Sequence, residues 1–218
     1  MQRSSFEREL VKIDDLVASM ARTAAEALSR ALHSLLTQDL ELAKSVKKGD
    51  RIIDGIQDSI EELVVEAIAT QQPVAIDLRH LMSVMKLAAD FERAGDYAVH
   101  LAKATKLFFA EPAWRQFDSL RSMAERGREM IEGTAQAYKA KDAGLARRVA
   151  ALDDDIDHCH KALLRDTLAL IQEHPELAER AAKIITVSGY LERLGDHMTN
   201  ACEAIVFMVE GSRVELND

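Results

Sequence analysis

The chain of 218 residues contains one helical pattern twice, and this duplication limits its fold more than any other feature. The segment DLELAKSVKKGDRIID at 39–54 returns as DAGLARRVAALDDDID at 142–157, with apolar residues and aspartates in matching places. Further along, ADFERAGDYAVH at 89–100 returns as GYLERLGDHMTN at 189–200. Such self-similarity is typical of a chain built from two copies of one structural unit. We therefore predict two equivalent units, 1–110 and 111–218.

Each unit has the pattern of three long helices. Apolar residues recur three and four apart along nearly the whole chain, which holds only nine glycines and three prolines. Asp39 and Asp142 are suitable N-cap residues, and Pro73 and Pro175 mark tight turns. The fold class predicted is all-α, two tandem three-helix bundles with a pseudo-twofold internal repeat. The predicted helices span 5–37, 39–71, 75–109, 113–140, 143–173 and 176–210.

The charge balance narrows the possible partners. With 28 basic and 37 acidic residues the formal net charge is -9, which argues against nucleic acid as a partner and favours cations or basic protein surfaces. No apolar run approaches the roughly 18 residues needed to span a bilayer, and the N-terminus lacks the apolar core of a signal peptide. We expect a soluble, cytoplasmic protein with no direct membrane insertion.

Each copy of the pattern places two acids four residues apart with a glycine between them. Glu92 and Asp96 flank Gly95 in the first copy, and Glu192 and Asp196 correspond to them in the second. Residues four apart lie on one face of a helix. Glycine in a helix interior costs about 1 kcal/mol relative to alanine. We therefore expect a neighbouring helix or a bound ion to come close at the glycine.

The turns of the predicted hairpins bring further acids to the same level. Antiparallel helices joined by a tight turn place side by side the residues that lie equally far from it. Asp54 precedes Pro73 by nineteen residues and Glu92 follows it by nineteen, while Asp50 and Asp96 are each twenty-three away. The second unit repeats this register. The candidate metal ligands are Asp50, Asp54, Glu92, Asp96, Asp153, Asp157, Glu192 and Asp196.

Four carboxylates at one partly buried level repel each other, and a multivalent cation removes the repulsion. Oxygen ligands without cysteine favour magnesium, manganese, calcium or iron over copper or structural zinc. An alternative is that these acids form solvated helix faces, because acidic pairs four apart also occur by chance in an acidic chain. Arg93 and Arg193, beside the acids, are candidates for structural salt bridges or for an anion site.

These motifs resemble the PhoU family, the accessory regulators of phosphate-specific transport. The resemblance covers nearly the whole chain, with its centre in DLRHLMSVMKLAADFERAGDYAVHLA at 77–102 and LERLGDHMTNACE at 191–203. It implies two tandem three-helix bundles, a homodimer, and metal ions or clusters held by the eight acids above. The metal is divalent or trivalent, with Mg, Mn, Fe, Ca and Zn left open. His100 stands where the second copy has Asn200, so the two sites are expected to differ.

The resemblance also implies the function. Members act in the cytoplasm as negative regulators, linking a phosphate ABC transporter to a sensor histidine kinase. The alternative is a carboxylate-bridged di-metal enzyme or metal storage protein, but such helical proteins use a Glu-x-x-His element on two helices. This chain has none, and the nearest analogue, Asp157 with His160, occurs once. We therefore predict a regulator without enzymatic activity.

Overall fold

The computed structural model describes residues 2–110 and 116–217, and within these ranges its regular structure is entirely helical. The all-α fold class is therefore confirmed. Three helices belong to the first repeat, and the second repeat begins with α4. The elements are α1 (Gln2–Thr37), α2 (Leu40–Gln71), α3 (Ile76–Leu107), α4 (Gln116–Ala140), α5 (Ala143–Ala150), α6 (Asp153–Glu173), the 3₁₀ helix η1 (Pro175–Leu177) and α7 (Ala178–Glu210).

The predicted N-caps of α2 and α5 are confirmed. The side chain of Asp39 accepts a hydrogen bond from the Leu42 amide at 2.9 Å, and Asp142 accepts one from the Leu145 amide at 2.9 Å. Each satisfies one of the amides that the first turn of a helix leaves without an intrahelical partner. The same chemistry therefore starts the second helix of each repeat.

The predicted helix 143–173 is wrong in one respect, because the chain forms two helices there. α5 ends at Ala150 and α6 starts at Asp153. The three consecutive aspartates at 153–155 occupy the first turn of α6, where negative charge interacts favourably with the helix dipole. The matching stretch of α2 has no such acidic run and continues as one helix. The predicted helix start at 113 lies outside the described residues.

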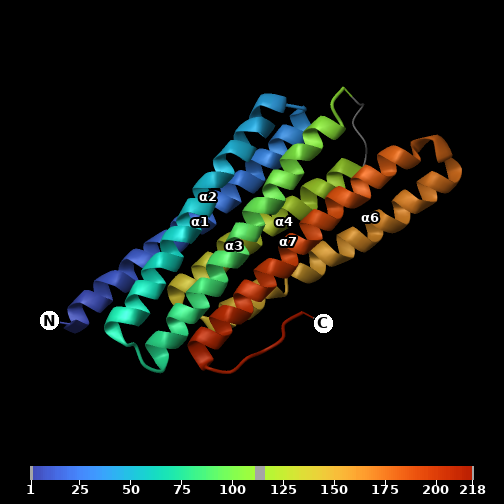
Figure 1. Ribbon diagram of the computed structural model, residues 1–218. Coiled ribbons are helices and arrows are strands. Elements are labelled where there is room, and N and C mark those ends of the chain that lie inside the picture. Colours follow the sequence, from blue (N-terminus) through green and yellow to red (C-terminus); the bar gives the residue numbers. More distant parts are fainter. Residues whose placement is uncertain (1, 111–115, 218) are drawn as a thin grey trace.

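The helices form two layers. Figure 1 shows α2, α3, α7 and α6 side by side in this order, with α1 and α4 behind them. The central helices α3 and α7 are antiparallel, since Asp90 bonds His197 while Tyr97 stacks on Tyr190. This antiparallel pair places the duplicated acidic motifs on adjacent helices in the middle of the layer.

A continuous hydrophobic core joins the two repeats. Phe108 packs edge to face on Phe117 across the joint, with ring centroids 5.2 Å apart. α4 comes close to α7 at Gly127, where an added Cβ would lie 2.8 Å from the Leu194 side chain. The predicted boundary between residues 110 and 111 borders the segment 111–115, outside the described residues, and it stays a prediction. Along 2–110 and 116–217, none of the helices combines the length and hydropathy that crossing a membrane requires.

Candidate metal centres

The first quartet of acids comes from two neighbouring helices. α2 provides Asp50 and Asp54, and α3 provides Glu92 and Asp96. Burial raises the pKa of Asp50, and the negative charges of Asp54 and Asp96 raise it further. Burial and the charge of Asp96 likewise raise the pKa of Glu92, whose side chain is 19% exposed. The predicted register thus brings the four carboxylates within electrostatic reach of one another, although Asp54 is exposed to solvent.

The second quartet is more deeply buried at one position. Asp153, at the first turn of α6, is only 8% exposed. Burial and then the charges of Asp196 and Asp157 raise its pKa to about 7. Its Oδ2 accepts a hydrogen bond from Thr199 Oγ1 at 3.5 Å. Its Oδ1 is buried and has no hydrogen-bond partner among the described residues, which is costly for a carboxylate oxygen.

The two motif glycines allow the acids of the neighbouring helix to come close. A Cβ at Gly95 would lie 2.7 Å from Ile53 Cδ1 and 3.3 Å from Asp50 Oδ1. A Cβ at Gly195 would overlap Asp153 Oδ1 and lie 3.3 Å from Ile156 Cδ1. The expected close approach of a neighbouring helix is therefore confirmed in both repeats.

One basic side chain forms an ion pair in each quartet and neutralises part of its charge. Arg93 Nη1 lies 2.9 Å from Asp96 Oδ2, and Arg93 Nε lies 3.3 Å from Glu92 Oε2. Lys161 Nζ lies 2.7 Å from Asp157 Oδ2. Arg93 therefore makes structural salt bridges, the first of the two alternatives. The ion pair of Lys161 was missed, although its spacing of four residues from Asp157 is a recognised helical pattern.

Histidine takes only a peripheral place at the second quartet. His158 is exposed, whereas His160 is partly buried and its Nδ1 lies 2.9 Å from Ser188 Oγ. The charge of His160 acts on Glu192, where it opposes the rise of the carboxyl pKa. Of the two histidines, therefore, the structure brings only His160 near the quartet.

The residues of both quartets suit a hard cation, although their side chains do not surround one as they lie. In the described part of the chain, no three His, Cys, Asp or Glu side chains are placed to hold an ion together. Binding would require carboxylates to turn away from Arg93 and Lys161. Two features fit an ion: the oxygen-only donor set and the buried, unpartnered Oδ1 of Asp153.

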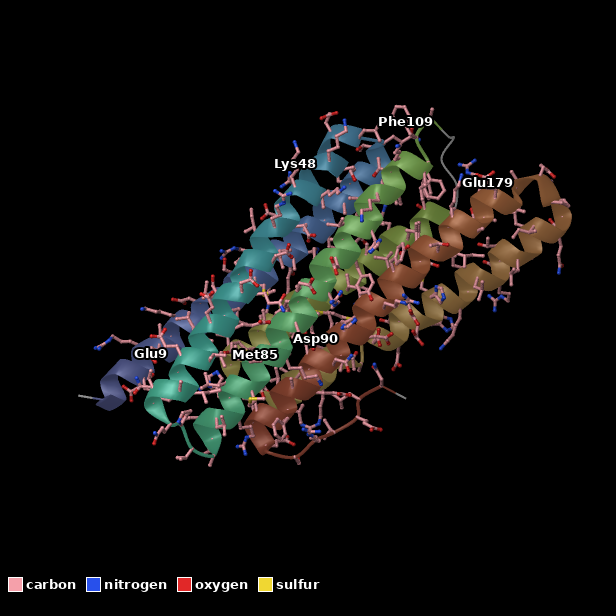
Figure 2. The ribbon with its side chains drawn as sticks, in the orientation of Figure 1. Glu9, Lys48, Met85, Asp90, Phe109 and Glu179 are labelled. Atoms are coloured by element: carbon pink, nitrogen blue, oxygen red, sulfur yellow. The ribbon has the colours of Figure 1, made fainter. Side chains whose placement is uncertain are left out.

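An aromatic seam, formed by Tyr97, His100, Tyr190 and His197, lies between the two quartets. His100 stacks on Tyr190 with ring centroids 4.6 Å apart, and Tyr97 lies 5.8 Å from His197. Asp90, labelled in Figure 2, bonds His197 Nδ1 at 3.0 Å from the facing helix. Sequence reasoning missed this seam. Its only signal was that the two repeats carry different residues at these positions.

His100 departs from the second repeat in its surroundings as well as its identity. Burial and the nearby charge of Lys103 lower the pKa of His100, while Asp96 opposes this. Lys103 also opposes the rise in the Asp50 pKa. The structure thus supports the expectation that the surroundings of the two quartets differ.

Fold and site together define a class: all-helical proteins made of two repeated helical units, each carrying an acidic quartet between two neighbouring helices, α2 and α3 in the first unit and α6 and α7 in the second. The family model of the PhoU domain matches this chain twice, at residues 17–105 and 120–205. The chain belongs to the PhoU family.

Curated relatives and solved structures agree with this assignment. A Clostridium acetobutylicum protein named "Phosphate-specific transport system accessory protein PhoU homolog" is 33% identical over the full length of both chains. A homologue of the same name from Aquifex aeolicus is 33% identical over 95% of this chain and 94% of its own. The crystal structure of PhoU from Pseudomonas aeruginosa superposes with a TM-score of 0.90 at 29% identity, covering 95% of this chain and all of that one. The two curated relatives are named as accessory proteins, in agreement with the prediction of no enzymatic activity.

Proposed function

We propose that this chain is a cytoplasmic, metal-binding regulator of phosphate uptake and phosphate-starvation signalling. The names of its full-length relatives support the phosphate-transport assignment. The duplicated quartets support the metal. The observation that carries the metal proposal is the buried, unpartnered Asp153 Oδ1, which lies directly against Gly195.

The proposed regulator is negative and acts between two partners. It links a phosphate ABC transporter to a sensor histidine kinase, and it represses the starvation response when phosphate is plentiful. Membership of the PhoU family supports this assignment, as it supports a homodimer. The family also favours this role over a carboxylate-bridged enzyme.

A bound cation would supply positive charge between α2 and α3 in the first repeat and between α6 and α7 in the second. Asp50, Asp54, Glu92 and Asp96 would hold it in the first repeat. Asp153, Asp157, Glu192 and Asp196 would hold it in the second. Such an ion removes the repulsion between the carboxylates and fixes the spacing of the two helices.

The test combines metal analysis with a cellular reporter. Elemental analysis of the purified chain is compared with that of Glu92→Gln/Asp96→Asn and Asp153→Asn/Asp196→Asn. The matched control is Glu62→Gln/Glu66→Gln, an exposed acidic pair four apart on α2. Each variant is also expressed in cells that lack the gene and carry a phosphate-starvation reporter.

We expect each quartet variant to lose metal and to leave the reporter active at high phosphate, while the control retains both properties. If all variants contain as much metal as the wild type, the proposed metal binding by the quartets is wrong. Full repression by both quartet variants would separate metal binding from regulation. A pull-down from cells grown at high and low phosphate tests the two partners. If neither partner is recovered at either phosphate level, their assignment is contradicted.

A further inference from the structure

The outer face of α2 carries an exposed stripe of charged residues. Figure 1 shows α2 at the edge of the layer, where it packs against α1 and α3 and leaves its remaining face open. Along this face, exposed residues recur three or four apart, which is the spacing of one side of a helix. We call them the outer stripe: Lys44, Lys48, Arg51, Gly55, Asp58, Glu62 and Glu66. Figure 2 labels Lys48, near the start of the helix.

The charges of the outer stripe are sorted along the helix. Its bases all precede Gly55, and its acids all follow Gly55. Lys48 lies seven residues before Gly55 and Glu62 lies seven after it, while Lys44 and Glu66 are each eleven away. A copy of the stripe turned end for end therefore presents acids opposite these bases, and bases opposite these acids.

Most of these charges are not used within the chain. Lys44 pairs with Glu41 of the same helix at 2.6 Å. The other charged residues of the outer stripe form no ion pair with any residue in 2–110 or 116–217. On α6, by contrast, Lys161 pairs with Asp157 and Arg165 lies near Asp166. The charges of the outer stripe are therefore available to a second surface.

The centre of the outer stripe allows another helix to come close. Gly55 lies in the interior of α2, where glycine destabilises a helix relative to alanine. Nothing lies within 4 Å of a Cβ added at Gly55, so the packing of the chain itself does not require a glycine there. Ile52, three residues away, is a large apolar side chain that is 59% exposed. A partner helix that crosses at Gly55 would cover Ile52 and remove its apolar surface from water.

We propose that the outer stripe binds the outer stripe of a second copy of this chain, with the two α2 helices antiparallel and crossing at Gly55. A two-fold axis at this crossing brings Lys48 of each copy opposite Glu62 of the other, and Lys44 opposite Glu66, so that every contact occurs twice. A parallel pair would place like charges together. This contact is the interface of the homodimer proposed above, and it rests on that part of the proposed function.

The pair and the metal sites can be tested separately. Each copy carries both of its acidic quartets, so metal binding and repression are expected to persist when the pair is lost. Glu62→Gln/Glu66→Gln, the control of the metal test, should therefore keep its metal while its dimer weakens. Loss of metal from this variant would contradict the separation of the two sites.

Sedimentation equilibrium of the full chain, in chelator, tests the pair. The variants are Lys48→Glu, Glu62→Lys, the double variant with both changes, and Gly55→Leu. The control is Arg165→Glu, which reverses a charge at the position of α6 that corresponds to Glu62. All these residues are exposed, so the variants are expected to fold, and circular dichroism checks this.

The wild type and Arg165→Glu are expected to be dimers at micromolar concentration. Lys48→Glu and Glu62→Lys should each raise the dissociation constant about tenfold or more, because the two-fold axis repeats each repulsive contact. Gly55→Leu should weaken the dimer by blocking the close crossing. The double variant should form dimers again, and so should an equal mixture of the two single variants, in which opposite charges meet at both contacts.

The failures of this proposal are distinct. A wild type that stays monomeric up to about 0.1 mM would overturn the homodimer together with this contact. A dimer that none of the variants weakens would overturn only the contact and place the interface elsewhere. If both single variants weaken the dimer but neither the mixture nor the double variant restores it, the antiparallel register is wrong.

Discussion

The sharpest test of the packing at the second quartet is Gly195→Ala, which adds one methyl group and removes no acid. Its Cβ would overlap Asp153 Oδ1 and lie 3.3 Å from Ile156 Cδ1. Overpacking of this kind costs about 1–3 kcal/mol. Alanine in a helix interior gains about 1 kcal/mol over glycine. The net change expected is a loss of roughly 0–2 kcal/mol in the free energy of unfolding.

Gly189→Ala provides the control in the same helix. Nothing lies within 4 Å of a Cβ added at Gly189, so this change should keep the full gain in helix propensity. The propensity terms cancel between the two variants, which leaves the overlap of about 1–3 kcal/mol as their difference. For a chain of this length, a difference of about 2 kcal/mol separates the melting temperatures by roughly 4–8 °C.

The assay is thermal unfolding followed by circular dichroism, in chelator and again with added manganese. Gly195→Ala should melt below Gly189→Ala in chelator. It should also gain less from the metal, because Asp153 must move away from Gly195. Equal melting temperatures would show that α6 and α7 are not in close contact at this level. A full metal-dependent gain in Gly195→Ala would show that the position of Asp153 does not matter for the ion.

Three further predictions concern single groups. Tyr138→Phe removes the hydroxyl that donates to Asp14 on α1, so denaturant titration should show a loss of about 1.5–3 kcal/mol, and no loss would mean that this bond contributes nothing. Asp153 retains a proton in the folded protein between its ordinary pKa of 3.8 and the raised pKa of about 7. The stabilisation that comes from the raised pKa of Asp153 is therefore present at low pH and lost as pH rises through 7. In chelator, the wild type should lose more stability than Asp153→Asn as pH rises from about 4 to 7. Arg93→Met frees two carboxylates from a competing cation, so calorimetry should show tighter manganese binding to the first quartet; weaker binding would contradict this competition.

Much of the helical hairpin of each repeat could be predicted because its structure is determined by residues within that hairpin. The spacing of apolar residues, the capping aspartates and the distance of each acid from the turn depend only on residues within one hairpin. The close approach at Gly95 and Gly195 agrees with the register obtained from those distances. Residues of one hairpin therefore carry enough information to align their own acids.

The contacts that were missed depend on competition or on packing between repeats. The break before Asp153 arises because three aspartates favour a new helix start over continuation of the apolar pattern. The stacking of His100 on Tyr190 depends on how α3 lies against α7. Helical periodicity within either repeat does not determine that arrangement.

The break between α5 and α6 makes the two quartets chemically unequal. In the first repeat, α2 runs unbroken past Asp50, which stays partly exposed and feels the opposing charge of Lys103. In the second repeat, the new helix start places Asp153 in the interior, with one oxygen unpartnered and the other on Thr199. A helix N-terminus ordinarily favours a carboxylate, yet burial and neighbouring acids outweigh this and raise the Asp153 pKa. Carboxyl pKa values are raised in both quartets, but only the second holds a buried carboxylate oxygen without a partner, and that quartet therefore gains more from an added cation.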